Sequence, residues 1–255
     1  MLISEIYQSR QGEGLLTGTP SVFLRTSGCN LRCGFCDTPF ASWEPTGEQM
    51  SIEEIRQAVS IAASKPIEFE TAGATNAESE SAEAATKFEP TKHLVLTGGE
   101  PMLPREVIEL CQAIKEDGFH ITIETAGTIY HDLPCDLMSI SPKLSNSDPS
   151  QSRAGEWLPK HQSNRSRPDI TLHLMETYNH QLKFVVDSPK DVDEILEYVD
   201  LVKPKDLSRV LLMPQGISTS ELDKREKWLA PLAEEHGFTF CARMHIKWYG
   251  NKRGT

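Results

Sequence analysis

The stretch SGCNLRCGFCDTPFASW, Ser27 to Trp43, carries three of the six cysteines in this chain of 255 residues. These three, Cys29, Cys33 and Cys36, follow the spacing C-x3-C-x2-C. Soft thiolates bind zinc, copper(I) or iron–sulfur clusters. A structural zinc site takes four protein ligands, so it would need a distant Cys or His here. The spacing therefore favours a 4Fe-4S cluster held by three cysteines, with one iron open to a non-protein ligand.

The length and charge of the chain limit its function. The length suits one domain, over residues 1–255, and the net charge of −11 argues against a broad nucleic-acid-binding surface. We therefore expect a small-molecule substrate. No apolar run is long enough to span a bilayer, and the start lacks the pattern of a secretory signal. We expect no membrane attachment and a cytoplasmic location, where clustered cysteines indicate metal or redox chemistry rather than disulfides.

Short apolar segments alternate with amphipathic ones along the chain. The apolar segments predict strands at 21–26, 93–97, 120–125, 137–141, 182–186 and 209–213, with a last apolar segment at 238–246. The amphipathic segments predict helices at 51–63, 104–118, 188–199 and about 218–237. Capping boxes at Ser51–Glu54 and Ser218–Glu221, and Ser188 before Pro189, predict three of the helix starts. The alternation predicts an α/β protein with a parallel sheet, either open or closed into a barrel.

Two polar segments interrupt this alternation, at about 65–92 and 145–169. Neither shows an apolar period, so we expect surface insertions that are partly mobile, lie away from the motifs and are dispensable for the chemistry. The remaining cysteines stand alone in the sequence. Cys111 lies on the apolar face of a predicted helix, and we expect it and Cys241 in the core. Cys135 could be buried or exposed.

The cysteine motif on the loop after a predicted strand resembles that of the radical S-adenosylmethionine (SAM) enzymes. TGGEP, at 97–101, is similar to the glycine-rich segment that contacts SAM in that superfamily, although alone it could be an ordinary turn. Phe35 resembles the superfamily's aromatic residue near the adenine. The resemblance implies a partial (modified) parallel β/α barrel, with Cys29, Cys33 and Cys36 holding the 4Fe-4S cluster.

Further motifs narrow the resemblance. They are QGEG at 11–14, CDT at 36–38, ETAGT at 124–128, SPK at 141–143, LKFVVD at 182–187 and MPQG at 213–216. Together they resemble the 7-carboxy-7-deazaguanine synthases, from Ile3 to about Gly254 apart from the insertions. The resemblance implies conversion of 6-carboxy-5,6,7,8-tetrahydropterin to 7-carboxy-7-deazaguanine with loss of ammonia, in the biosynthesis of queuosine and related 7-deazapurines. It also implies SAM and Mg²⁺ as cofactors, an electron donor such as a flavodoxin or ferredoxin, and a homodimer.

The same resemblance implies the site residues. Those implied to bind SAM are Phe35, Cys36, Asp37, Gly99, Glu124, Ser141, Pro142, Lys143 and Lys183. Those implied to bind the substrate are Arg10, Gln11, Gly12, Glu13, Arg25, Thr97 and His245. Thr38 is the implied Mg²⁺ ligand, and the segment at about 238–255 is implied to close the pocket. The residue types suit these roles, because guanidinium binds carboxylate in a bidentate way and Mg²⁺ takes few protein ligands beside substrate oxygens.

Each of the less certain roles has a structural alternative. Thr38 could cap a turn, and Arg25 could form a surface ion pair. Lys183 lies inside a buried strand, where it needs a charged partner or a ligand, so an ion pair inside the barrel is equally compatible with the sequence. His245 could be a packed structural histidine.

Two other functions fit part of the sequence. One is a radical SAM activating enzyme that acts on a protein partner, although this chain lacks the extra ferredoxin-type cysteines of the enzymes closest in layout. The other is a zinc-stabilised binding module. Iron and sulfide analysis under anaerobic conditions distinguishes the module from both enzymes, and QGEG with CDT favours the pterin substrate over a protein partner.

Overall fold

The computed structural model describes residues 1–65 and 90–255, so the predicted insertion at 65–92 lies almost wholly outside the described residues. The described part is built on one nine-stranded sheet with the order β3-β1-β2-β4-β5-β6-β7-β8-β9. The strands are β1 Leu2–Arg10, β2 Pro20–Thr26, β3 Glu48–Gln49, β4 His93–Gly98, β5 His120–Thr125, β6 Leu137–Ile140, β7 His180–Val186, β8 Val210–Pro214 and β9 Thr239–Phe240.

The sheet is mostly parallel and does not close. Every pair from β2 to β9 is parallel, whereas β1 pairs antiparallel with both β2 and β3. The short strands β3 and β9 form its two edges. The prediction of a partial parallel β/α barrel is therefore confirmed. β1 was not predicted, because only Ile3 and Ser9 of its nine residues are buried and the buried face is too sparse to read as a strand.

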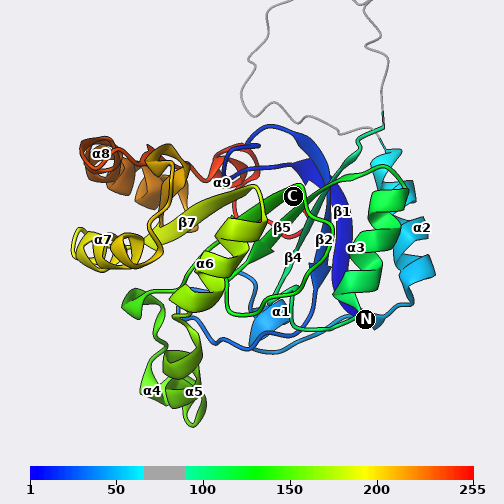
Figure 1. Ribbon diagram of the computed structural model, residues 1–255, viewed down its shortest axis with the longest axis horizontal. Helices are drawn as coiled ribbons and strands as arrows, with labels where there is room; N and C mark the ends of the chain where they lie inside the picture. Colours follow the sequence, from blue (N-terminus) through cyan, green and yellow to red (C-terminus); the bar gives the residue numbers. More distant parts are fainter. Residues whose placement is uncertain (66–89) are drawn as a thin grey trace, which may run out of the picture.

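Helices lie around the sheet and its connecting loops. They are α1 Pro39–Ser42, α2 Ile52–Ala63, α3 Val107–Glu116, α4 Gln151–Ala154, α5 Trp157–Asn164, α6 Pro168–Thr177, α7 Asp191–Val202, α8 Thr219–Glu235 and α9 Met244–Tyr249, with 3₁₀ turns η1 Ser145–Ser147 and η2 Leu207–Arg209. In Figure 1, α2 and α3 lie side by side at one end of the sheet, and α7 and α8 lie at the other. Among the described residues, no helix is both long and apolar enough to cross a bilayer.

The first turns of α2, α7 and α8 can be compared with the predicted N-caps. At α2 the capping box is present, since Ser51 Oγ accepts from Glu54 N and Glu54 Oε2 accepts from Ser51 N at 2.7 Å. At α8 only half of the box forms, because Ser218 caps the helix while the Glu221 carboxylate binds the Ile217 amide instead. The prediction that Ser188 caps α7 was wrong.

The N-cap residue of α7 is Lys190, and the helix begins at Asp191. The Asp191 carboxylate accepts from the amides of Asp187 and Ser188 and from the Ser188 hydroxyl at 3.1 Å. The serine hydroxyl therefore serves as a donor to this aspartate rather than as an acceptor for the helix amides.

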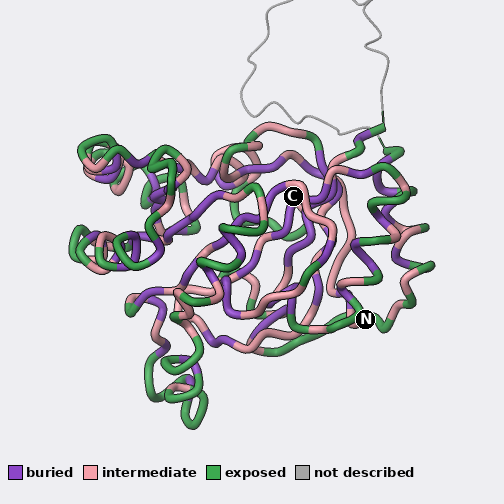
Figure 2. The backbone as a smooth tube through the Cα atoms, viewed as in Figure 1, coloured by how far each residue is buried: buried purple, intermediate pink, exposed green. Residues whose placement is uncertain are grey.

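The second insertion also differs from its prediction. Residues 145–169 form η1, α4, α5 and the start of α6, and they pack against the cysteine loop rather than away from the motifs. The two complete helices have only four and eight residues. Such short helices cannot show an apolar period, and the only buried residue of α5 is the polar His161. Most of this segment is exposed, as Figure 2 shows for α4 and α5.

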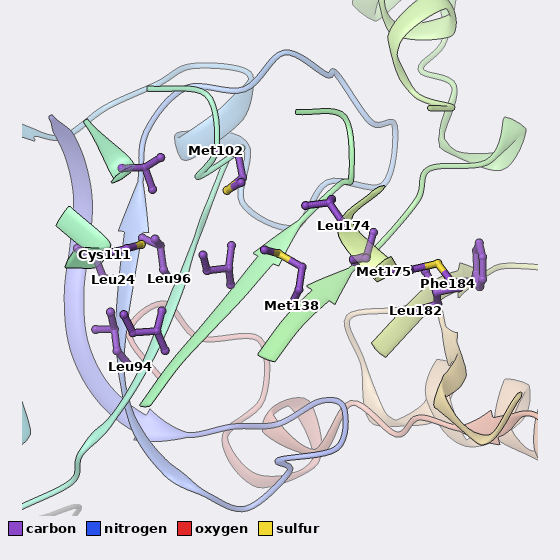
Figure 3. Packing of buried hydrophobic residues seen from close by; sticks show 14 of the residues in the cluster. Leu24, Leu94, Leu96, Met102, Cys111, Met138, Leu174, Met175, Leu182 and Phe184 are labelled. Carbon is purple, nitrogen blue, oxygen red and sulfur yellow. The ribbon is translucent and has the colours of Figure 1, made fainter. Parts of the chain in front are cut away.

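Apolar side chains from the strands and the covering helices form the core. Leu24, Leu94 and Leu96 from β2 and β4 are packed with Cys111 of α3, and Met138 and Phe184 continue the core toward β7 (Figure 3). Burial of Cys111 and Cys241 is therefore confirmed, and Cys135 is half-buried.

Leu96→Ala should remove a side chain that is fully buried between the sheet and its helices. We expect a loss of about 2–5 kcal/mol in the free energy of unfolding, because the cavity adds to the lost transfer free energy. Leu201→Ala is the control, since Leu201 on α7 is 65% exposed and its loss should change the free energy by less than about 0.5 kcal/mol. Urea unfolding of both variants measures the difference, and equal values would contradict the assigned core.

Candidate active site

A cavity of about 580 Å³ opens at the carboxyl ends of the parallel strands, where barrel enzymes place their chemistry. It is walled by the cysteine loop after β2, the ends of β4 to β8, the loop after β1 and the C-terminal residues 251–255. The predicted site residues that line it are Arg10, Gln11, Gly12, Glu13, Arg25, Cys29, Cys33, Phe35, Cys36, Asp37, Thr38, Thr97, Gly99, Glu124, Ser141, Lys143, Lys183 and His245. Pro142 is buried and does not line the cavity.

The cysteine loop is held by backbone contacts to its neighbours. Gly28, with φ +111°, donates its amide to Ala41 O at 2.8 Å and accepts from Glu100 N at 2.9 Å. A side chain at Gly99 would collide with the Gly28 and Ala41 carbonyls. Gly99 is therefore required for close packing of the TGGEP turn on the cysteine loop, whatever else it contacts.

The three motif cysteines are half-buried free thiols. The Cys29 sulfur accepts from Leu31 N at 3.3 Å, and the Cys36 sulfur lies 3.1 Å from Ser42 Oγ. Burial raises the pKa of both Cys29 and Cys33 to about 12. A metal centre that binds them must therefore displace their protons, as metal binding to thiols does in general.

These residues fit a 4Fe-4S cluster. Three soft donors from one loop face a cavity with room beside them. Among residues 1–65 and 90–255, no three His, Cys, Asp or Glu side chains converge on a point where a single metal ion would bind. A cluster makes no such demand, because each thiolate binds a different iron.

Thr38 lies at the N-cap position of α1, followed by Pro39, yet its hydroxyl makes no capping hydrogen bond. The alternative that Thr38 merely caps a turn therefore has no support in this geometry. Its Oγ1 lies 3.8 Å from the Cys36 sulfur and on the cavity wall. This places an oxygen donor directly beside the third cysteine.

A network of charges, centred on the buried cations Lys183 and Arg243, crosses the cavity. Glu13 pairs with Lys183 at 2.5 Å and with Arg243 Nε at 3.0 Å. Lys183 also lies 3.4 Å from Glu124, and Arg243 Nη2 lies 2.5 Å from Asp37. The alternative of an ion pair inside the barrel is thus what the structure shows for Lys183.

The network fixes the charge of its members. Burial alone would raise the pKa of Glu13, but the charges of Lys183 and Arg243 outweigh it and hold that pKa well below its usual range. Burial would lower the pKa of Lys183, but Glu13 and Glu124 raise it above its ordinary value. Both groups therefore remain ionised at neutral pH inside the cavity.

Arg25 is also engaged by a carboxylate. The antiparallel register of β1 and β2 pairs Glu5 with Arg25, and Arg25 Nε donates to Glu5 Oε1 at 2.7 Å. Glu5 in turn accepts from Arg253 Nε at 2.8 Å, and the Arg253 guanidinium lies 4.1 Å from the centre of the Phe40 ring. The C-terminal segment therefore reaches the cavity wall through Arg253, where the sequence implied that it closes the pocket.

The QGEG turn and the start of α9 are in direct contact. Met244 N donates to Gly12 O at 2.8 Å, and a side chain at Gly12 would meet His245 Cβ at 2.6 Å. Burial lowers the pKa of His245 although Glu13 opposes this shift, and Nδ1 lies 3.8 Å from Glu13 Oε1. Gln11 is buried and donates to Ser21 Oγ at 2.9 Å, so its amide nitrogen is oriented by the protein.

The SPK segment follows β6. Lys143 Nζ donates to both the carbonyl and the hydroxyl of Ser141, each at 2.7 Å. Burial lowers the pKa of Lys143, while Cys33 opposes the shift. Lys143 therefore lines the same cavity as the motif cysteines, with its ammonium held by Ser141.

Two central residues were missed by sequence reasoning. Arg243 joins Glu13, Asp37 and the Gly216 carbonyl, which accepts at 2.7 Å. Glu100 is fully buried and accepts from Met102 N, Thr125 Oγ1 and Ala126 N. Arg243 stands in no motif that we could read, whereas Glu100 lies inside TGGEP and its apolar surroundings could have marked it as a structural acceptor.

Comparison with known proteins shows the family of this chain. The family model of the 4Fe-4S single cluster domain matches residues 10–144, so the cluster-binding half of the fold is that of this family. Taken with the partial barrel, this defines a radical SAM enzyme. A 7-carboxy-7-deazaguanine synthase from Rhodopirellula baltica is 42% identical over 100% of this chain and 89% of its own length. One from Halobacterium salinarum is 40% identical over 96% and 88%. The chain belongs to the 7-carboxy-7-deazaguanine synthase family.

A solved structure supports the fold. The crystal structure of QueE from Escherichia coli matches with a TM-score of 0.60 over 96% of this chain and 94% of that one, at 20% identity. Family membership favours the small-molecule enzyme over a protein-activating enzyme and over a zinc-stabilised module.

Glu13→Gln should make the free energy of unfolding less dependent on pH in the acid range. In the folded protein the pKa of Glu13 is lowered, so the unfolded chain takes up its proton first as the pH falls through about 4.3. The stabilisation is therefore complete above that pH and is lost as the pH falls toward the depressed folded pKa. Urea unfolding of the cluster-free protein from about pH 6 to about pH 3.5 measures this difference.

The control is Glu176→Gln, a change at an exposed position on α6, which should keep the wild-type pH dependence. At neutral pH, Glu13→Gln should itself cost about 3–5 kcal/mol, because Lys183 and Arg243 are buried and each loses one of its two carboxylate partners. An acid dependence equal to that of the wild type would show that Glu13 is not held ionised.

Proposed function

We propose that this protein converts 6-carboxy-5,6,7,8-tetrahydropterin to 7-carboxy-7-deazaguanine with release of ammonia, in 7-deazapurine (queuosine) biosynthesis. The observation that carries the proposal is the cavity, which places the three motif cysteines, Thr38 and the Glu13 network around one space. The family membership supports the same reaction.

Cys29, Cys33 and Cys36 would hold the 4Fe-4S cluster. When bound, the cluster and SAM supply a one-electron cleavage whose radical product removes a hydrogen atom from the substrate. The protein supplies position and charge. The SAM-binding wall would consist of Phe35, Cys36, Asp37, Gly99, Glu124, Ser141, Lys143 and Lys183. Pro142 would act only by shaping the SPK turn, because it does not reach the cavity.

A second set of cavity residues would bind the pterin. Arg10, Gln11, Gly12, Glu13, Thr97 and His245 line the cavity and present donors and acceptors to a flat heterocycle. The fixed negative charge of Glu13 suits the amino edge of a pterin. Arg25 would attract the substrate carboxylate while remaining paired with Glu5.

Thr38 would complete a Mg²⁺ site with the substrate carboxylate. Its hydroxyl is not used by the helix cap and faces the cavity beside Cys36. Magnesium needs oxygen donors and keeps few protein ligands when a substrate supplies the rest. The ion would neutralise the carboxylate and orient the pterin ring.

The proposal extends to the surroundings of the reaction. A one-electron donor such as a flavodoxin or ferredoxin would reduce the cluster, and the protein would work in the cytoplasm as a homodimer. The C-terminal segment at about 238–255 would close the pocket over bound substrate, because Arg243, His245 and residues 251–255 already line it.

Anaerobic turnover tests the reaction. We expect the reconstituted protein to convert the carboxypterin in the presence of SAM and a reductant, and to show an iron–sulfur absorption near about 400 nm. Cys29→Ala, Cys33→Ala and Cys36→Ala should each abolish both signals. The matched control is Cys111→Ala, which lies in the core and should keep both. Turnover by a variant that lacks all three motif cysteines would refute the assignment.

Thr38→Ala should keep the cluster and SAM binding but lower turnover by up to about 10²-fold, because the substrate loses its orienting metal. It should also weaken the response to added Mg²⁺. Thr38→Ser keeps the oxygen and should recover much of the rate. The measurement is turnover against Mg²⁺ concentration in the wild type and both variants. Equal activation in all three would remove Thr38 from the metal site and leave Asp37 as the next oxygen to test.

A further inference from the structure

His161 is the one fully buried residue of α5, a helix whose other residues are exposed or half-buried. Its side chain has 0% exposure, and its imidazole reaches the cysteine loop. A buried imidazole in such a helix costs desolvation that only specific hydrogen bonds can offset. The partners of His161 therefore indicate what the segment around it does.

The hydrogen bonds of His161 define one tautomer. Arg32 N can only donate, and it lies 3.1 Å from His161 Nδ1, so Nδ1 must be the unprotonated acceptor. On the other side, the Ser147 hydroxyl donates to Leu144 O at 2.6 Å. The Ser147 oxygen is then free to accept from His161 Nε2 at 3.1 Å. The neutral imidazole therefore links the cysteine loop to η1, because it accepts from Arg32 N and donates to Ser147 Oγ.

A second amide of the loop is bound beside the first. Gly34 N donates to Ser147 O at 2.8 Å, and Gly34 O accepts from Arg153 Nη1 at 3.0 Å. A Cβ at Gly34 would lie 3.2 Å from Asp148 O, so the two backbones are in close contact. Arg32 and Gly34 are the two neighbours of Cys33 in the sequence. Both sides of the central cysteine are thus fixed by the same segment.

Aromatic side chains cover these bonds. The Arg32 guanidinium lies 4.0 Å from the Trp157 ring centre, and the Arg153 guanidinium lies 4.1 Å from that of Trp43. Trp43 Nε1 also donates to Cys33 O at 3.1 Å. The cation–π contacts add attraction between the cysteine loop and this segment.

We infer that residues 144–165 are a brace for the cysteine loop, and that His161 is the positioning residue that holds Cys33 ready for its iron. The inference rests on the proposed function, in which Cys33 is a cluster ligand. Its physical basis is conformational entropy. A loop that is already ordered loses less conformational entropy when the cluster binds, so binding is more favourable.

The test compares His161→Ala with His161→Asn. The Asn side chain places Oδ1 where Nδ1 lies in histidine, so it keeps the acceptor for Arg32 N, whereas Ala removes it. In the cluster-free protein, we expect Cys33 to be alkylated about ten- to hundredfold faster in the Ala variant, the range expected for the loss of one buried hydrogen bond. In the reconstituted protein, iron should pass to a chelator faster by a similar factor. The Asn variant should lie near the wild type in both measurements.

Two controls separate positioning from general destabilisation. Cys111 is 1% exposed and remote from the loop, so its alkylation in the same samples should not change. His173→Ala, at an exposed position on α6, should match the wild type. If His161→Ala does not fold, the double change Ser147→Ala with Asp148→Asn replaces it, because it keeps the imidazole but removes the hydroxyl and the carboxylate that face Nε2, and the same faster alkylation of Cys33 is expected.

The outcomes are distinct. If His161→Ala shows wild-type rates of Cys33 alkylation and of iron release, the proposed role of residues 144–165 is wrong, while the proposed function remains intact. The brace is also overturned if the Asn variant reacts as fast as the Ala variant, or if Cys111 accelerates together with Cys33. Failure of the wild type to hold any cluster would instead refute the proposed function, whatever the variants of His161 do.

Discussion

The carboxylate of Glu13 is largely buried and links parts of the open sheet that are not joined by strand pairing. Strands β3 and β9 are the two edges of the sheet and do not pair, so hydrogen bonds between strands cannot close the barrel. The loop after β1 spans the gap instead, because Glu13 binds Lys183 from β7 and Arg243 from the segment after β9. A buried carboxylate without both cations would be strongly unfavourable, so this closure depends on all three charges.

Backbone bonds reinforce the same bridge. Leu15 N donates to Gln181 Oε1 at 2.9 Å, and Gly14 N donates to the Cys241 sulfur at 3.2 Å. Gly12 leaves the space that His245 fills. The QGEG turn therefore builds one wall of the cavity, and it also makes that wall charged. Gly12, Glu13 and His245 take part in this closure and are also proposed to bind the pterin, so binding and folding are coupled at this wall.

The strands and helices that could be predicted are those with a clear apolar signal, such as the continuous buried run of β4 and the single apolar face of α3. β1 and the short helices of residues 145–169 gave no such signal. The cluster-binding role of the cysteine loop could be predicted because the spacing of its three cysteines is visible in the sequence. The pair of Glu13 and Lys183 could not, because 170 residues separate the partners and only the fold brings them together. Arg243 was missed for the same reason.

The cysteine motif alone does not determine the position of its thiols. Gly28 is bound by Glu100 N, and the Glu100 carboxyl accepts from Thr125 Oγ1 and Ala126 N beyond β5. Burial raises the pKa of Glu100, while the hydrogen bonds that its carboxyl accepts from Ala126 N and Thr125 Oγ1 oppose this shift. One side of the loop is thus positioned by backbone and side-chain hydrogen bonds that connect it to the ends of β4 and β5. The other side of the loop is instead held by the helical segment that contains His161, whose imidazole accepts from Arg32 N.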